Sequence, residues 1–180
     1  MDDIDLVEQY LSGNEKAFEE LIMKYQKKIY GLAYRMTRDI EESKDITQST
    51  FLQAIRYVSG FRNKSSFKTW LYKITYNLSL NHLNKRKKHE AELSESIIGN
   101  ECGALGILLE KERGYEILKA LSGVPDRQRL SIILRTYEGL SCRETAEIMN
   151  ISEGAVKANY HNGLKKMKVL IGKKGYDSGS

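Results

Sequence analysis

The sequence predicts an all-α protein made of two small helical domains joined by a flexible linker. Apolar residues recur at helical spacing through most of the 180 residues, and no segment alternates apolar and polar residues for long. A glutamate-rich stretch interrupts this spacing, as a linker between domains would. We therefore expect a first domain over residues 1–88, a linker over 89–106 and a second domain over 107–180.

Two helical segments of the first domain are expected on either side of a polar break at residues 37–41. Asp39, with Glu42 three residues later, has the spacing of a capping pair that begins the second segment. Each segment should bury one face in a common core. The positions with helical spacing are Phe18, Leu21, Ile22, Tyr25, Ile29, Leu32 and Ala33, then Ile46, Thr50, Ala54 and Val58.

A further helical segment contains the stretch SSFKTWLYKITYN at residues 65–77, which is rich in aromatic and basic residues. At 100° per residue, Tyr72 and Tyr76 lie a turn apart, opposite the apolar stripe. We expect their rings to be exposed beside Lys73, either as a solvated pair or as platforms for stacking a flat ligand. The apolar stripe consists of Phe67, Leu71, Ile74 and Leu78, with Trp70 at its edge.

The net charge of +5 is distributed unevenly along the chain. Residues 61–89 carry eight Lys or Arg and residues 154–176 carry six Lys, in both cases without an acidic residue. Residues 90–116 carry seven Glu against two basic residues. Because a solvated surface normally mixes both signs, the two basic blocks indicate a polyanionic partner, with nucleic acid favoured over lipid. Surface charge that only aids solubility is the alternative for either block.

Several other classes of protein fit the sequence poorly. No apolar run is long enough to span a bilayer, and the acidic start MDDIDLVEQY lacks the features of a secretory signal, so we expect a reducing, cytoplasmic setting. Cys102 and Cys142 have the spacing of neither a disulfide framework nor a metal site. The scattered His82, His89 and His161 form no catalytic constellation. We therefore expect no enzymatic activity, metal or cofactor.

In the second half, LSCRETAEIMNISEGAVKANYHNGLKKMK has the signals of two helices joined by a tight turn. Ser141 and Glu144 have the spacing of a capping box that begins the first helix. Asn150 stands where the turn needs a left-handed residue, which asparagine tolerates better than most residues. Ser152 then has the position of an N-cap for the second helix.

The same segment has the spacing of a DNA-binding helix-turn-helix. Val156 follows small Ala146 by ten residues, which lets the two helices cross closely. A plain helical hairpin shares these offsets, but it does not need a lysine-rich second helix, so DNA reading is favoured. Lys157, His161 and Lys165 lie on one stripe of that helix, where they can reach base edges or phosphates.

Four blocks of the chain resemble the extracytoplasmic-function (ECF) sigma factors, in the order in which that family carries them. AFEELIMKYQKKIYGLAYRM resembles the opening helices of the sigma-2 domain, and ESKDITQSTFLQAIR resembles its polymerase-binding helix. FRNKSSFKTWLYKITYN resembles the promoter-melting segment. VPDRQRLSIILRTYEGLSCRETAEIMNISEGAVK resembles the sigma-4 domain, which reads the -35 element.

The resemblance implies a bacterial cytoplasmic protein whose partners are core RNA polymerase, promoter DNA and an anti-sigma factor. It implies polymerase contacts for Asp45, Gln48, Ser49, Phe51 and Gln53. Contacts with the -10 element and its melted strand are expected for Phe61, Arg62, Asn63, Lys64, Lys68, Trp70, Tyr72, Lys73, Tyr76, Asn77, Lys85, Arg86, Lys87 and Lys88. Contacts with the -35 element are expected for Arg143, Ser152, Glu153, Gly154, Lys157, Ala158, His161, Asn162 and Lys165.

Two other classes of function stay open at this point. A helix-turn-helix repressor would account for the second half, but it leaves the basic aromatic segment at 61–89 without a role. An adaptor or anti-sigma-binding protein would account for the helices, but not for the two basic blocks. Co-purification with core polymerase separates all three classes.

Overall fold

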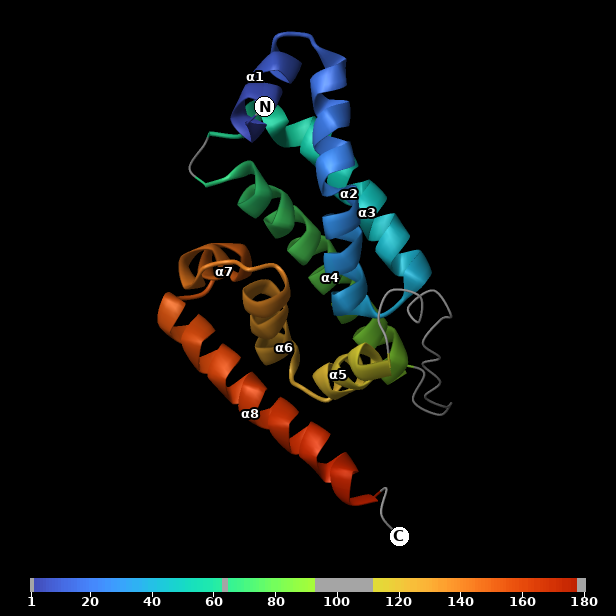
Figure 1. Cartoon of the computed structure of the whole chain (residues 1–180). Helices are drawn as coiled ribbons and strands as arrows, with labels where there is room; N and C mark the ends of the chain where they lie inside the picture. The colour runs from blue at the N-terminus through green and yellow to red at the C-terminus, as the bar shows by residue number, and fades with distance from the viewer. Residues whose placement is uncertain (1, 63–64, 93–111, 178–180) are drawn as a thin grey trace. The chain divides into compact units, whose positions relative to one another are not determined.

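Figure 1 shows the chain as a computed structural model, which describes residues 2–62, 65–92 and 112–177. The secondary structure in these ranges is helical throughout, and the chain divides into two compact units, Met1–Glu101 and Cys102–Ser180. The predicted all-α architecture of two domains is confirmed. The expected limits of the linker stay a prediction, because residues 93–111 lie outside the described residues. None of the described helices is long and apolar enough to cross a membrane.

The first unit is a bundle in which one long α-helix contacts each of the other α-helices. It contains α1 (Asp3–Leu11), α2 (Glu15–Thr37), α3 (Ile40–Tyr57), the short 3-10 helix η1 (Val58–Gly60) and α4 (Phe67–Glu92). α2 packs against α1, α3 and α4, and α3 also packs against α4. Each of the three longest helices therefore has two or more helical neighbours.

A two-residue turn joins α2 to α3 and brings them side by side. Arg38 adopts the left-handed conformation with φ 62° and ends α2. The Asp39 side chain accepts a hydrogen bond from the Glu42 backbone N at 2.9 Å and begins α3, as predicted. The predicted core positions of both helices are buried, except for the half-buried Ile22.

The second unit contains α5 (Glu112–Ser122), α6 (Asp126–Ile132), the π-helical segment η3 (Ile133–Tyr137), α7 (Cys142–Met149) and α8 (Glu153–Asp177). α8 packs against α5, α6 and α7. Pro125 is the N-cap of α6. The unit is thus organised around α8.

The predicted helix-turn-helix is confirmed in its local geometry. Ser141 Oγ accepts from the Glu144 backbone N at 3.1 Å, and Glu144 Oε2 accepts from the Ser141 backbone N at 2.8 Å, which completes the capping box of α7. Asn150 is left-handed with φ 53°. Ser152 Oγ then accepts from the Ala155 backbone N at 3.1 Å and caps α8. Val156 is fully buried.

α8 crosses α6 at Gly163. A Cβ atom on Gly163 would lie 2.8 Å from Ile132 Cδ1 and 3.2 Å from both Cβ and the carbonyl oxygen of Gln128. The Ile132 methyl can move, but the Gln128 oxygen belongs to the backbone of α6. The two helices can therefore lie this close only because Gly163 has no side chain.

We predict that Gly163→Ala lowers the free energy of unfolding by about 1–3 kcal/mol, the usual cost of overpacking a close contact. Urea unfolding of the full chain, followed by circular dichroism, measures this change. Gly172→Ala is the matched control, since Gly172 lies in the same helix with no atom within 4 Å of its Cβ position. The control should gain up to about 1 kcal/mol from the helix propensity of alanine. Equal stability of both variants would contradict a close crossing at Gly163.

Candidate nucleic-acid interface

The first candidate surface is built at the start of α4. The Ser66 hydroxyl accepts from the Thr69 backbone N at 3.1 Å, and the Ser66 carbonyl accepts from the Trp70 backbone N at 3.0 Å. Ser66 therefore caps α4 and fixes Phe67 and Trp70 in its first turn. Two of the predicted site residues, Asn63 and Lys64, lie outside the described residues.

An aromatic cluster joins this first turn to η1 and α2. The Trp70 ring centroid lies 5.3 Å from that of Phe61 and 5.5 Å from that of Phe67, and Phe67 lies 5.9 Å from Tyr25. Phe67 and Tyr25 are buried, whereas Phe61 and Trp70 are half-buried. The exposed aromatic surface of the predicted melting segment therefore belongs to Phe61 and Trp70.

The buried end of the cluster is tied to α1 through Asp3. The Tyr25 hydroxyl donates to Asp3 Oδ2 at 2.5 Å, and Lys24 Nζ lies 2.5 Å from Asp3 Oδ1. Burial, followed by the hydrogen bond to Asp3, raises the pKa of Tyr25, so its hydroxyl keeps the proton that it donates. These contacts hold the ring that supports Phe67.

The prediction that Tyr72 and Tyr76 are exposed is wrong. Tyr72 is 0% exposed and Tyr76 is 6% exposed, and Lys68 Nζ lies 5.4 Å from the centroid of the Tyr72 ring. The physical reason is that α4 packs against both α2 and α3, so its buried surface is wider than one apolar stripe. Ile74 and Leu78, which belong to the apolar stripe predicted for this helix, are only half-buried. The two tyrosines therefore have no free ring face for stacking in this conformation.

A signal for this second buried stripe was present in the sequence. Small hydroxyl residues share it with the tyrosines, and Thr50 Oγ1 donates to Thr75 Oγ1 at 3.4 Å between α3 and α4. Such short side chains let two helices approach closely. The buried positions along this stripe are Tyr72, Thr75, Tyr76, Ser79 and Leu83, at offsets of 0, 3, 4, 7 and 11.

The remaining residues of the predicted -10 surface follow α4 and the turn before it. Half-buried members are Lys68, Lys73 and Arg86. Exposed members are Arg62, Asn77, Lys85, Lys87 and Lys88. Cationic side chains therefore lie both near the aromatic surface and in the second half of α4.

The predicted polymerase surface lies on α3 and is only partly exposed. Asp45 and Gln48 are exposed, and Ser49 and Gln53 are half-buried. Phe51, in contrast, is 8% exposed, so its ring belongs to the core of the first unit and not to a contact surface.

Two apolar residues that the sequence reasoning missed complete this face of α3. Leu52 is 60% exposed and Ile55 is 41% exposed. With Asp45 and Gln48 they form a stripe with offsets of 0, 3, 7 and 10, which we call the α3 stripe. Their positions between the buried Thr50 and Val58 were the available signal.

The second candidate surface is the exposed side of α8. Lys157, His161 and Lys165 lie on one exposed stripe, and Ala158 and Asn162 are exposed beside it. Ser152, Glu153 and Gly154 are exposed at the start of α8, and Arg143 is exposed on α7. These residues of the predicted -35 surface therefore all reach solvent.

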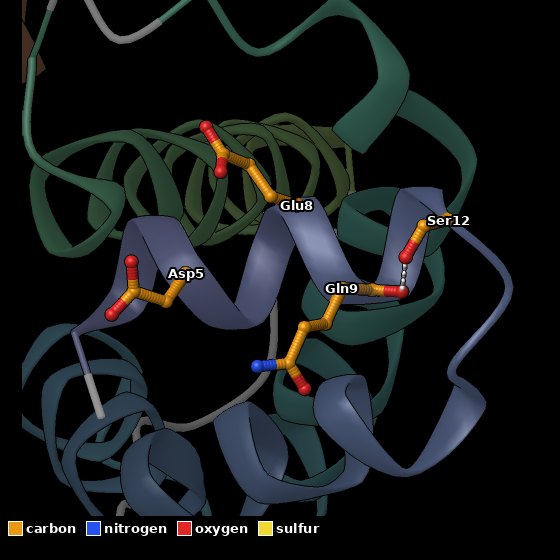
Figure 2. A pocket seen from close by; sticks show the side chains of 4 residues that line it. All are labelled: Asp5, Glu8, Gln9 and Ser12. Atoms are coloured by element: carbon orange, nitrogen blue, oxygen red, sulfur yellow. Dashed lines mark hydrogen bonds between the residues drawn. The ribbon is translucent and has the colours of Figure 1, made fainter.

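α1 carries a surface of the opposite charge. Figure 2 shows a shallow depression lined by Asp5, Glu8, Gln9 and Ser12, in which Ser12 Oγ donates to the Gln9 carbonyl at 2.8 Å. Two carboxylates make this depression unsuitable for a phosphate backbone. Among the described residues, no group of His, Cys, Asp and Glu has an arrangement that could hold a metal ion.

Comparisons with known proteins match both units. The model of Sigma-70 region 2 matches residues 21–89, and that of Sigma-70, region 4 matches residues 115–167. RNA polymerase sigma-H factor of Pseudomonas aeruginosa is 33% identical, with 87% of this chain and 86% of the relative covered. ECF RNA polymerase sigma factor SigW of Bacillus subtilis is 32% identical, with coverage of 90% and 92%. The chain belongs to the ECF sigma factors of the sigma-70 family.

Solved structures share the fold of this ECF sigma factor. One is the sigma factor RpoE in complex with the anti-sigma factor NepR from Bartonella quintana, with a TM-score of 0.73, 20% identity and coverage of 87% of this chain and 97% of that chain. Another is CnrH in complex with the cytosolic domain of CnrY, with a TM-score of 0.71, 22% identity and coverage of 99% of both chains. These structures show the fold, while the two matching regions and the curated relatives confirm the family resemblance of the four sequence blocks.

Because Tyr72 is a core residue, we predict that Tyr72→Ala lowers the free energy of unfolding by about 3–5 kcal/mol, as other buried aromatic truncations do. Thermal and urea unfolding of the full chain measure this loss. Tyr57→Ala is the control, since Tyr57 is 56% exposed and its loss should cost about 0.5 kcal/mol or less. Wild-type stability of Tyr72→Ala would restore the original prediction of an exposed ring.

Proposed function

We propose that this ECF sigma factor binds core RNA polymerase through α3, opens promoter DNA at the start of α4 and reads the -35 element with α8. The observation that supports this most is the match of two sigma-70 regions to two separate compact units, in family order. Each matched unit also carries an exposed cationic surface. The chemistry required is binding and strand separation, which needs no catalytic side chain.

In the first unit, Phe61 and Trp70 act as the stacking surface for bases that leave the duplex. Each base stacked on an aromatic ring contributes about 1–3 kcal/mol to holding the melted strand. Arg62, Lys85 and Lys88 attract the phosphate backbone without reading its sequence. Tyr72 and Tyr76 hold α4 in place and do not stack on bases.

The α3 stripe is the surface for core polymerase. Its exposed leucine and isoleucine are the type of apolar group that an interface buries, and Asp45 and Gln48 supply polar contacts at one end. The family resemblance assigns the polymerase contact to this same helix. An anti-sigma factor, the partner in one solved relative of this fold, is the regulator that the family implies for the chain.

In the second unit, the exposed stripe of α8 enters the major groove. Lys157 can pair with guanine acceptors and Asn162 with adenine, each good bidentate contact discriminating by about 1–3 kcal/mol. Lys165 lies about two turns beyond Lys157 on α8 and is suited to a contact with a phosphate. The capping box that begins α7 and the left-handed Asn150 that ends it support this proposal, because a helix-turn-helix has a tight turn before its second helix.

Binding to core polymerase tests the proposed function as a whole. The wild-type chain should co-purify with core polymerase and support promoter-dependent transcription. Leu52→Ser should raise the Kd for core polymerase about five- to thirtyfold, since about 1–2 kcal/mol of apolar burial is lost. Met23→Ser is the matched control, because Met23 is an apolar residue that is 69% exposed on α2. Duplex binding without polymerase, unchanged by Leu52→Ser, would instead favour a helix-turn-helix regulator.

Sequence readout by α8 has its own test. Asn162→Ala should change the preferred -35 sequence in a promoter-library selection, because a base-reading amide is lost. Lys165→Ala should weaken all promoters alike and lower the slope of log affinity against log salt by about 1. An unchanged -35 preference for both Asn162→Ala and Lys157→Ala would remove α8 from sequence readout.

A further inference from the structure

The end of α6 makes an unusual contact with α8. At η3 the Glu138 backbone N donates to the Ile133 carbonyl at 3.1 Å, five residues back. Adjacent side chains of a regular α-helix diverge by about 100°. Here Arg135 and Thr136 both reach Tyr160: the guanidinium carbon lies 5.7 Å from the ring centroid, and Thr136 Oγ1 lies 3.3 Å from the Tyr160 hydroxyl. The π-helical segment thus directs two neighbouring side chains at one ring.

Arg135 also holds the start of the helix-turn-helix. Its Nη1 donates to the Leu140 carbonyl at 2.8 Å, and Leu140 directly precedes Ser141, the N-cap of α7. Arg135 Nε is buried without a hydrogen-bond partner among the described residues. The guanidinium is therefore half-desolvated, which strengthens its attraction to the Tyr160 ring. One side chain therefore connects η3, the start of α7 and the first half of α8.

Tyr160 occupies a particular place on the inward side of α8. Val156, Tyr160, Gly163 and Met167 have offsets of 0, 4, 7 and 11, so they share one stripe. Val156, Gly163 and Met167 are buried, and hydrophobic contacts of this kind fix a distance better than a direction. Tyr160 is half-buried and makes the geometrically specific contacts of the stripe. Tyr160 also directly precedes His161, which lies on the exposed side of α8.

We infer that Arg135 and Tyr160 are a positioning pair that fixes the rotation of α8 and thereby sets discrimination at the -35 element. This inference rests on the proposed function of the second unit. In this role neither side chain touches DNA; the pair acts through the angle at which Lys157, His161 and Asn162 are presented. Removing either partner should release the same constraint.

A double-mutant cycle on the full chain bound to core polymerase tests the pair. The measured quantity is the ratio of affinities for a promoter duplex with the preferred -35 sequence and one with that sequence substituted. Arg135→Ala and Tyr160→Leu should each lower this ratio about two- to fivefold, the scale of one cation–π contact. The double variant should lose no more than the larger single loss, because both changes remove one contact.

Two control variants and one further test variant accompany the cycle. Tyr160→Phe keeps the ring and should retain the ratio within about twofold. Arg127→Ala removes an exposed arginine of α6 and should leave the ratio unchanged, which separates positioning from loss of charge. Arg135→Lys keeps the charge but not the planar guanidinium, so it should lower the ratio. This variant tests the inference independently if Tyr160→Leu reduces the thermal stability of the chain.

The outcomes are distinguishable. Losses that multiply in the double variant would overturn the inference, because independent effects indicate that each residue contacts DNA or acts separately. An unchanged ratio for Arg135→Lys, or for Tyr160→Leu at wild-type melting temperature, would also overturn it. Absence of any -35 discrimination by the wild-type complex would refute the proposed function itself.

Discussion

Packing of α4 against both α2 and α3 is the constraint on which the first unit depends. Tyr72 and Tyr76 fill one side of this contact, and Thr50 and Thr75 keep α3 and α4 close. With α4 held from two sides, the rings at its first turn are presented from a rigid base. Exposed aromatic surface can then serve for stacking without loss of the core.

In the second unit, the orientation of α8 is the corresponding constraint. In the proposed function α8 exposes one side to a DNA groove, while its other side packs against three neighbouring helices. Gly163 permits close approach to α6, and Val156 anchors the end near α7. Between them, the contact of the Tyr160 ring with Arg135 supplies a direction that apolar packing does not provide.

Charge is divided between the surfaces according to their proposed partners. The exposed sides of α4 and α8 carry lysine and arginine, which suit phosphate. The α3 stripe adds exposed leucine and isoleucine to Asp45 and Gln48, which suits a protein partner. α1 carries carboxylates, and that of Asp3 accepts a hydrogen bond from Tyr25 and forms an ion pair with Lys24. The surfaces proposed for nucleic acid and for a protein partner thus lie on different helices of the first unit, α4 and α3.

The sequence by itself determined the all-α class, the two domains, the family and the local signals of the helix-turn-helix. The cap at Ser141 and the left-handed Asn150 were predictable because they depend on bonds within a few residues. The buried side of α4 was decided only by tertiary structure, since helical periodicity gives the spacing of a stripe but not the number of neighbouring helices. For the same reason, the burial of Phe51 was decided only by the packing of α2 and α4 around α3.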